Sequence, residues 1–429
     1  MVNRQKLCLV VTNRKGPSGG LSSYTYRMAE THEYKEQVGA CSECGNSPTH
    51  HLAQYVIATI DIWGANLSYR LGRVPIAQRA FSTLGSLSER MDYFNHSLMR
   101  KLRLIRSGHL IEKARTYRSQ VVWEEAARRG ITMEQIVFLG SHSDVYRARI
   151  HDRWVYFESL PIPRSYSYDA YRWLDDKYRL NTVLSGAGVP VPALASVTSE
   201  SQAVAAFKNM NGRAVTKPRA GSRGRHTTTN IRDEAALRAA FKSAQKLCQY
   251  VCVTRHLDGS ICRGTLVDGK LVGFFQADPP RLIGDGVSSI GELLDAKNKA
   301  RHERVQPVEL REEHEAYLRR AGYTLESVLK DKEVLDLTHR TGRLFGGETR
   351  ELLTSVHPKL RAYLEKAATA LKVPIVGFDL IVKDPEADPD TQEWGIIEAN
   401  SLPFIDLHYL PLYGEPSNVA KHVWDLWFT

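Results

Sequence analysis

Two apolar segments near the C-terminal end of the chain contain polar side chains that could bind a divalent cation. Asp379 lies in the first segment, and Glu398 and Asn400 lie in the second. Side chains alternate along a strand, so Glu398 and Asn400 should share a face, and a hairpin turn at about 383–393 would bring Asp379 beside them. Two carboxylates and an amide oxygen are hard ligands of the kind that Mg²⁺ uses when it bridges phosphates. An unpaired carboxylate in such an apolar segment would be costly, which favours a metal site over a structural role.

A second group of residues could bind phosphate. Lys217 ends a short apolar segment and is followed by a loop that contains Gly221, Ser222 and Gly224. Glycine lets the backbone turn so that several N–H groups point at one anion, and the lysine adds a full charge. The spacing differs from the P-loop pattern, so a P-loop fold is disfavoured. By itself this segment could equally be a flexible basic loop.

The pattern of apolar residues predicts the elements that position these groups. Before Pro161 we expect a strand at 5–13, a loop at 14–50, a strand at 54–63, a helical region at 85–130, and strands near 136–139 and 145–157. After it we expect helices at 172–185, 233–247 and 357–371, strands at 193–197, 213–217, 250–253, 375–382 and 394–399, and a hairpin over 261–276.

The order of these motifs and elements along residues 170–429 resembles that of ATP-grasp ligases. The resemblance is greatest to the ATP-grasp domain of cyanophycin synthetases, and glutathione-synthetase-type ligases come next. Its most specific stretch is Ile283 to Leu294, with Gly-Asp-Gly near its start, followed by Asn298. Further matches are Gly346-Gly347, Glu351 (Asp in the family), His357-Pro358, Asp379, Glu398 and Asn400, His408, Pro411, Gly414 and Pro416.

The resemblance implies a role for each matching residue. Lys177 and Lys217 would contact the nucleotide phosphates, and Arg263 would lie near the transferred phosphate, with Lys217 and Arg263 as the catalytic pair. Gly221, Ser222 and Gly224 would form the loop that closes over the phosphates. The segment Val251 to Leu257, with Val253 and Arg255, would hold the adenine. Asp379, Glu398 and Asn400 would bind magnesium, as two ions.

The resemblance also implies the architecture. The fold class is α/β and α+β, an ATP-grasp fold with a preceding Rossmann-like N-terminal domain. We place a basic N-terminal domain of possible substrate-binding role at 1–165, the small ATP-binding lobe at 166–260, and the catalytic lobe with the magnesium site at 261–429. The sequence departs from the family at Thr254 and Ile261, where acidic residues are usual, and at 342–347, which usually helps to hold the acyl substrate. These departures leave the nucleotide contacts and the substrate open.

The function implied is ATP-dependent formation of an amide or peptide bond between a carboxylate and an amine, through an acyl-phosphate, with release of ADP and phosphate. No Mur-ligase-like domain follows the ATP-grasp segment, so we do not expect cyanophycin synthesis by this chain alone. Alternatives are an ATP-grasp kinase or phosphotransferase, a basic RNA- or tRNA-associated protein, and a catalytically inactive binding module. The Asp379, Glu398 and Asn400 set argues against the last of these.

The basic charge of the chain is concentrated near its start. Residues 1–165 contain 23 Lys and Arg against 14 Asp and Glu, whereas the whole chain of 429 residues has a formal net charge of +10. Such an excess suits an acidic amino acid or peptide as substrate, or a solvated helical face. We see no aromatic-interleaved RNA motif, so nucleic acid is not an expected partner.

Four residues could form a zinc site. Cys41 and Cys44 are spaced as Cys-x-x-Cys, with His50 and His51 shortly after them, although this is half of a usual signature and a plain polar loop is the alternative. The six cysteines are too few for a disulfide framework, which favours a reduced, cytoplasmic protein. No apolar run is long enough to cross a membrane. A homo-oligomer is compatible with the sequence.

Overall fold

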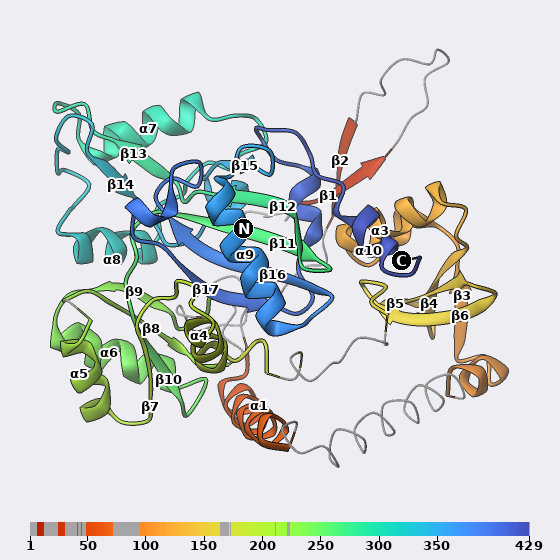
Figure 1. Ribbon diagram of the computed structural model, residues 1–429. Helices are drawn as coiled ribbons and strands as arrows, with labels where there is room; N and C mark the ends of the chain where they lie inside the picture. The colour runs from red at the N-terminus through yellow and green to blue at the C-terminus, as the bar shows by residue number, and fades with distance from the viewer. Residues whose placement is uncertain are drawn as a thin grey trace. The chain divides into compact units, whose positions relative to one another are not determined.

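The computed structural model describes residues 7–12, 25–30, 41, 44, 49–71, 95–163, 171, 173–210, 212–220 and 224–428 (Figure 1). The chain forms two compact units. The first comprises residues 1–41 and 86–161, and the second comprises residues 42–85 and 162–429. Among the described residues, no helix is long and apolar enough to span a membrane.

The first unit contains antiparallel β-structure. β1 (Leu7–Thr12) pairs with β2 (Thr25–Glu30). A four-stranded sheet has the order β3 (Ile105–Gly108), β4 (Met133–Phe138), β5 (Ser141–Ile150) and β6 (Arg153–Glu158), and all its neighbours are antiparallel. A Rossmann-like domain requires a parallel sheet with crossover helices, so that prediction is wrong for the described part of this unit. The predicted loop at 14–50 contains β2, and the predicted helical region at 85–130 contains β3.

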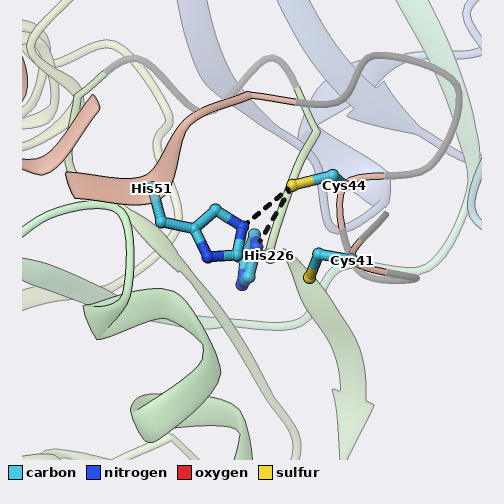
Figure 2. Close-up of side chains that lie close together, drawn as sticks. All are labelled: Cys41, Cys44, His51 and His226. Carbon is cyan, nitrogen blue, oxygen red and sulfur yellow. Dashed lines mark hydrogen bonds between the residues drawn. The ribbon is translucent and has the colours of Figure 1, made fainter. Parts of the chain in front are cut away.

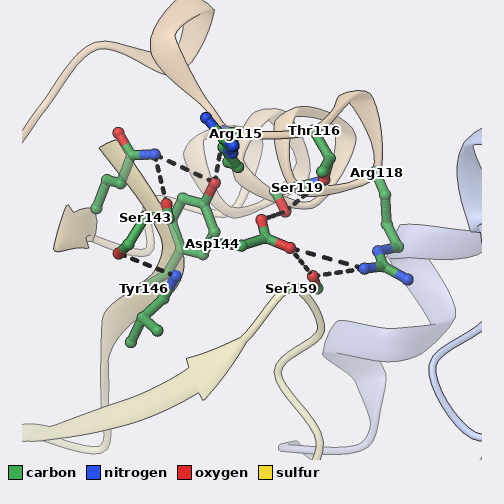
Figure 3. A network of polar contacts seen from close by, with 10 residues as sticks. Arg115, Thr116, Arg118, Ser119, Ser143, Asp144, Tyr146 and Ser159 are labelled. Carbon is green, nitrogen blue, oxygen red and sulfur yellow. Dashed lines mark hydrogen bonds and ion pairs between the residues drawn. The ribbon is translucent and has the colours of Figure 1, made fainter. Parts of the chain in front are cut away.

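A buried polar network joins the helix of this unit to its sheet (Figure 3). Thr116 caps the start of α3 (Tyr117–Arg128) by accepting from the backbone of Ser119. The Ser119 hydroxyl donates to Asp144 on β5 over 2.7 Å, and Arg118 donates to Ser159 over 2.6 Å. Asp144 also accepts from the Ser159 hydroxyl. These contacts join α3 to β5 and to Ser159, the residue that follows β6.

The second unit begins with a helix where the sequence predicts a strand. α1 spans His51–Leu71 and includes the predicted strand 54–63. That segment is short and rich in β-branched residues, and periodicity alone does not separate a buried strand from a helix at this length. In the structure Ala58 and Ile62, four residues apart on one helical face, are buried against Ala220 and Cys248. Packing along that face, together with the Nδ1 of His50 accepting from the backbone of Ala53, favours the helix.

A small lobe follows, built on a four-stranded antiparallel sheet. Its order is β7 (Leu194–Val197), β10 (Val251–Arg255), β8 (Ala214–Pro218) and β9 (Thr228–Ile231). Helices α5 (Glu200–Lys208) and α6 (Glu234–Gln245) contact each other and this sheet. Both helices begin at side-chain caps, Ser199 and Asp233, which accept from the first-turn backbone. The apolar residues of sheet and helices form one core cluster.

The larger lobe is built on a five-stranded antiparallel sheet (Figure 1). Its order is β15 (Thr349–Glu351), β12 (Lys270–Ala277), β11 (Ser260–Val267), β16 (Ile375–Val382) and β17 (Gly395–Asn400). α9 (Pro358–Leu371) contacts β11 and β12, and α4 (Lys177–Gly186) contacts β17 and α9. These elements bury the main core cluster of the chain. The C-terminal helix α10 (Val419–Asp425) also contacts β11 and β12.

A third cluster lies beside the larger lobe. β13 (Arg281–Ile283) pairs with β14 (Val334–Asp336), and α7 (Ile290–Ala300) and α8 (Glu312–Ala321) pack into the same apolar cluster. The mixed α/β and α+β class and the two-lobe arrangement of the second unit agree with the predicted fold class. The strands and helices predicted after residue 170 are present. The structure adds the helices α5, α7, α8 and α10 and the strands β9, β13, β14 and β15.

Candidate functional site

A bulge in β17 determines which side chains share the functional face of the larger sheet. Asp379 is opposite Glu398, but the next residue, Leu380, is opposite Ile396, so Ile397 has no partner in the ladder. The extra residue turns Ile396 into the core while Glu398 stays beside Asp379. Asn400 lies opposite Gly377, two positions along. The structure therefore brings Asp379, Glu398 and Asn400 together, as the predicted hairpin requires.

Arg263 of β11 completes this face. Its backbone is opposite Asp379, and its guanidinium binds that carboxylate through two hydrogen bonds, Nε to Oδ1 at 2.7 Å and Nη2 to Oδ2 at 2.6 Å. The nitrogen of Asn400 donates to the same Oδ2 over 3.2 Å. Burial would lower the pKa of Arg263, but the charge and hydrogen bonds of Asp379 raise it. The guanidinium thus holds a permanent charge beside the proposed metal ligands.

Lys177 reaches one of these carboxylates, that of Glu398, from α4, which packs on β17. It is the first residue of α4 and is buried, and its Nζ lies 3.3 Å from Oε1 of Glu398. Burial acts to lower the pKa of Lys177, yet Glu398, Cys252 and Asp175 together raise it. Conversely, burial acts to raise the pKa of Glu398, and Lys177 and Lys217 hold it below its ordinary range. The pair is therefore ionised in the absence of a ligand.

Lys217 lies on β8 of the small lobe, opposite Cys252 of β10. Its Nζ donates to the carbonyl of Ile397, the bulge residue, over 3.3 Å. Burial and the nearby charge of Lys177 lower the pKa of Lys217. Burial raises the pKa of the Cys252 thiol to about 11, because burial disfavours the charged thiolate, so this thiol stays neutral between the two lysines. Lys177, Lys217 and Arg263 therefore meet the carboxylates of Asp379 and Glu398 where the two lobes join.

The loop after Lys217 differs in part from the predicted phosphate loop. Arg219 turns inward and binds Asp176, the N-cap residue of α4, through Nε at 2.8 Å and Nη2 at 2.6 Å. Its guanidinium also lies over the rings of Tyr178 and Tyr250. This arginine anchors the start of α4 rather than offering a charge to a ligand. Gly221 and Ser222 lie outside the described residues, and Gly224 has the left-handed φ of +77° that glycine favours.

The predicted adenine segment is largely engaged in secondary structure. Val253 is fully buried, and its strand lies between β7 and β8, where Val253 is opposite Ala195 and Thr216. Arg255 forms an ion pair with Glu393 at 3.0 Å, which links the small lobe to the larger one. The structure thus places Val253 in the core, and Arg255 at the connection between lobes.

The most specific family stretch, Ile283 to Leu294, builds the third cluster and does not reach the lysines. Asp285 accepts from the hydroxyl and the backbone of Ser288 and from the backbone of Val287, which lowers its pKa to about 2. The side chains of Ser289 and Glu292 form a capping box at α7. The side chain of Asn298 donates to the backbone carbonyl of Val308 and accepts from its backbone N–H.

The Cys/His group forms with one change of ligand. Cys41, Cys44, His51 and His226 present ligand atoms that all lie within 4.8 Å of one another (Figure 2). The sequence does not indicate His226 as a ligand, because this residue lies in the loop between β8 and β9, far from the cysteines in the chain. The predicted ligand His50 is instead exposed and caps α1.

Sequence reasoning also missed Asp175 and Cys252. The carboxylate of Asp175 accepts from the backbone and hydroxyl of Ser401, which follows β17, and burial raises its pKa. Asp175 precedes Lys177 by two residues and Cys252 lies in the predicted adenine segment, but only register and packing place the two side chains beside the lysines.

The chain is similar to cyanophycin synthetases and to bifunctional glutathione biosynthesis proteins. It is 29% identical to the cyanophycin synthetase of Synechocystis over 262 residues, 59% of this chain and 30% of that protein. It is 25% identical to the bifunctional glutathione biosynthesis protein of Mannheimia succiniciproducens over 322 residues, 72% of this chain and 42% of that protein. The chain thus spans less than half the length of either relative.

Among solved structures, the bifunctional glutathione synthetase from Pasteurella multocida has 22% identity and a TM-score of 0.48, covering 72% of this chain and 44% of that one. The D-alanine–D-alanine ligase from Bacillus anthracis has 14% identity and a TM-score of 0.36, covering 60% of this chain and 67% of that one. No protein-family model matches the chain. The predicted resemblance to cyanophycin synthetases, with glutathione synthetases next, is confirmed by sequence.

Proposed function

We propose that this chain is an ATP-dependent ligase that joins a carboxylate of an amino acid or peptide to an amine. The observation that carries the proposal is the meeting of Lys177, Lys217 and Arg263 with Asp379 and Glu398 at the junction of two lobes. Such a set suits a nucleoside triphosphate bound with a divalent cation, because the lysine and arginine charges offset the negative charge of the phosphates. The sequence similarity to cyanophycin synthetases supports the reaction class.

The residues fit magnesium by the chemistry of their donor atoms. Asp379 and Glu398 offer carboxylate oxygens, and Asn400 donates through its nitrogen to Asp379, which leaves its oxygen as an acceptor. A carboxylate has about four lone-pair sites, so Asp379 can hold the Arg263 fork and a cation together. Asp379, Glu398 and Asn400 would hold the ion, which supplies charge neutralisation for the phosphates.

In the proposed reaction the substrate carboxylate oxygen attacks the γ-phosphorus of ATP, the bond to the β-phosphate oxygen breaks, and ADP leaves. The amine nitrogen then attacks the acyl carbon, phosphate leaves, and the nitrogen loses a proton. Lys217 and Lys177 orient the phosphates, and Arg263 stabilises the charge that develops in the transfer. The loop after Lys217 would exclude water from the acyl-phosphate.

The test measures phosphate and ADP release by the full chain with ATP, Mg²⁺ and pairs of amino acids or short peptides. We expect stimulation by one acid and one amine, and an amide product by mass spectrometry. Glu398→Gln should lower turnover by about 10²-fold or more, because it removes a metal ligand and the partner of Lys177. Glu386→Gln, an exposed carboxylate in the hairpin beyond β16, is the matched control.

Two outcomes would contradict this proposal. A phosphorylated acceptor in place of an amide would make the chain a kinase or phosphotransferase. A Glu398→Gln variant with full activity would remove the metal assignment.

The finer identity of the partners extends the proposal. Lys101, Arg103, Arg106, Lys113 and Arg115 are exposed in the first unit, which supports an acidic amino acid or peptide as substrate. Stimulation by acidic peptides, and not by neutral ones of equal length, is the expected result. A reduced, cytoplasmic setting suits five cysteines of the described residues, which form no disulfide with one another.

A further inference from the structure

We propose that Cys41, Cys44, His51 and His226 form a structural zinc site. Figure 2 shows the four side chains converging from three places in the chain: the Cys-x-x-Cys segment, the first residue of α1, and the loop that leads into β9. Two thiolates and two imidazoles are a usual ligand set for structural zinc. Nothing in the proposed ligase chemistry uses these residues.

The distances match the edges of a zinc tetrahedron. Sγ of Cys44 lies 3.3 Å from Nε2 of His51 and 3.5 Å from Nε2 of His226. A zinc ion about 2.3 Å from sulfur and about 2.0 Å from nitrogen, with tetrahedral angles, places those atoms about 3.5 Å apart. The His51 and His226 rings are 4.9 Å apart at an interplanar angle of 86°, so each ring can direct its Nε2 to a common point.

The far side of the His226 ring is held as a zinc ligand requires. Its Nδ1 lies 2.8 Å from the carbonyl oxygen of Ser243 and 3.0 Å from the Ser243 hydroxyl. A carbonyl only accepts, so the proton is on Nδ1, and Nε2 keeps its lone pair toward Cys44. A backbone carbonyl that fixes the tautomer in this way is the usual outer partner of a metal-bound histidine.

Burial separates this group from a chance surface cluster. The His226 side chain is fully buried, and Cys44 is 2% exposed. Beside it, Ala58 and Ile62 of α1 pack on Ala220 and Cys248. Ala220 and His226 flank the proposed phosphate loop, so α1 would hold one end of that loop by packing and the other through the metal.

The first test measures zinc in the full chain, purified under reducing conditions and passed through a desalting column. We expect about one zinc ion per chain, and a loss of most of it in Cys44→Ser and His226→Gln. His50→Gln and Cys248→Ser are matched controls that should keep the metal. His50 neighbours the site in sequence only, and Cys248 is a buried thiol next to it.

The second test does not depend on variants that fold. The wild-type chain, stripped of metal and reduced, is titrated with Co²⁺, and we expect tetrahedral visible bands with a thiolate-to-cobalt charge-transfer band. Removing zinc should also lower the melting temperature, which zinc but not Mg²⁺ restores.

The site would be overturned if the reduced wild-type chain took up no stoichiometric zinc and gave only octahedral cobalt bands. A disulfide between Cys41 and Cys44 in a chain without metal affinity would make the pair a redox device instead. A folded His226→Gln variant with unchanged zinc content would equally overturn the ligand set.

Discussion

Lys177 and Lys217 are both buried beside Glu398, yet their pKa values move in opposite directions. Lys177 is in contact with the carboxylate, which outweighs burial and raises its pKa. Lys217 donates to a backbone carbonyl, and burial and the charge of Lys177 lower its pKa. Of the two proposed phosphate ligands, Lys217 therefore loses its proton first as the pH rises.

This difference predicts an alkaline limb in nucleotide use. As the pH rises through the lowered pKa of Lys217, kcat/KM for ATP should fall, because a neutral amine no longer attracts phosphate. Lys217→Arg should move the limb to higher pH, since a guanidinium stays charged. Lys297→Arg is a matched control, because burial also lowers the pKa of Lys297 in α7, away from the site. An unmoved limb in Lys217→Arg would show that another group titrates.

The fork of Arg263 makes a second prediction. Arg263→Lys keeps the charge but loses the two-point contact to Asp379, so we expect kcat to fall about 10²-fold with little change in melting temperature. Arg281→Lys is the matched control, because Arg281 forms a similar fork with Asp336 on β13 and β14. Equal losses of kcat in both variants would point to a structural role alone.

Two histidines predict how stability depends on pH. Burial and Arg213 lower the pKa of His256 to about 4, and burial and Arg340 lower that of His339 to about 4, from 6.5. Between pH 4 and pH 6.5 the unfolded chain binds more protons than the folded chain. The free energy of unfolding should therefore fall as the pH drops from about 6.5 to 4. Urea unfolding at pH 7 and pH 5 measures the loss. His256→Gln should reduce this loss.

At the scale of elements, the site depends on irregular points more than on regular ones. The bulge at Ile397 presents Glu398 to the functional face, and the capped start of α4 presents Lys177. The family stretch at 283–298 builds α7 and its neighbours through caps and turns. These residues serve local geometry in the structure, so a stretch that resembles a family strongly need not lie at the chemistry.

Glycines at close approaches give a prediction at this scale. A Cβ on Gly347 would lie 1.8 Å from the carbonyl oxygen of Asp278, so backbone must shift in Gly347→Ala. We expect a loss of about 1–3 kcal/mol in the free energy of unfolding. Gly186→Ala, at the end of α4 with nothing within 4 Å of the added carbon, should instead be neutral or gain up to about 1 kcal/mol. Thermal or denaturant unfolding that ranks the two variants the other way would refute the packing argument.

At the scale of the whole molecule, part of the basic excess is neutralised internally. Arg118 pairs with Asp144, Arg128 and Arg129 with Glu125, and Arg147 with Glu134. These arginines stabilise α3 and its sheet, so their charge is partly offset before any partner arrives. The basic count of the first 165 residues therefore overstates what a ligand would meet.

From this we predict weak RNA binding. The affinity of the chain for a duplex or single-stranded RNA should be low at 50 mM salt and should show a shallow salt dependence, because several arginines of the described residues are paired with carboxylates. Filter binding at rising salt measures the slope. A steep slope with tight binding would revive the RNA-associated alternative.

The sequence alone determined which polar residues of the C-terminal part share one face. Asp379, Glu398 and Asn400 could be placed on one face because strand alternation is local and the hairpin between them is short. The resemblance that assigned phosphate-binding roles to Lys177, Lys217 and Arg263 also came from the sequence. Only tertiary structure decided the roles of Arg219 and His226. Their partners, Asp176 for Arg219 and Cys44 for His226, lie far away in the chain. It also decided that 54–63 is helical, since burial of one face against Ala220 and Cys248, and not local preference, selects the element.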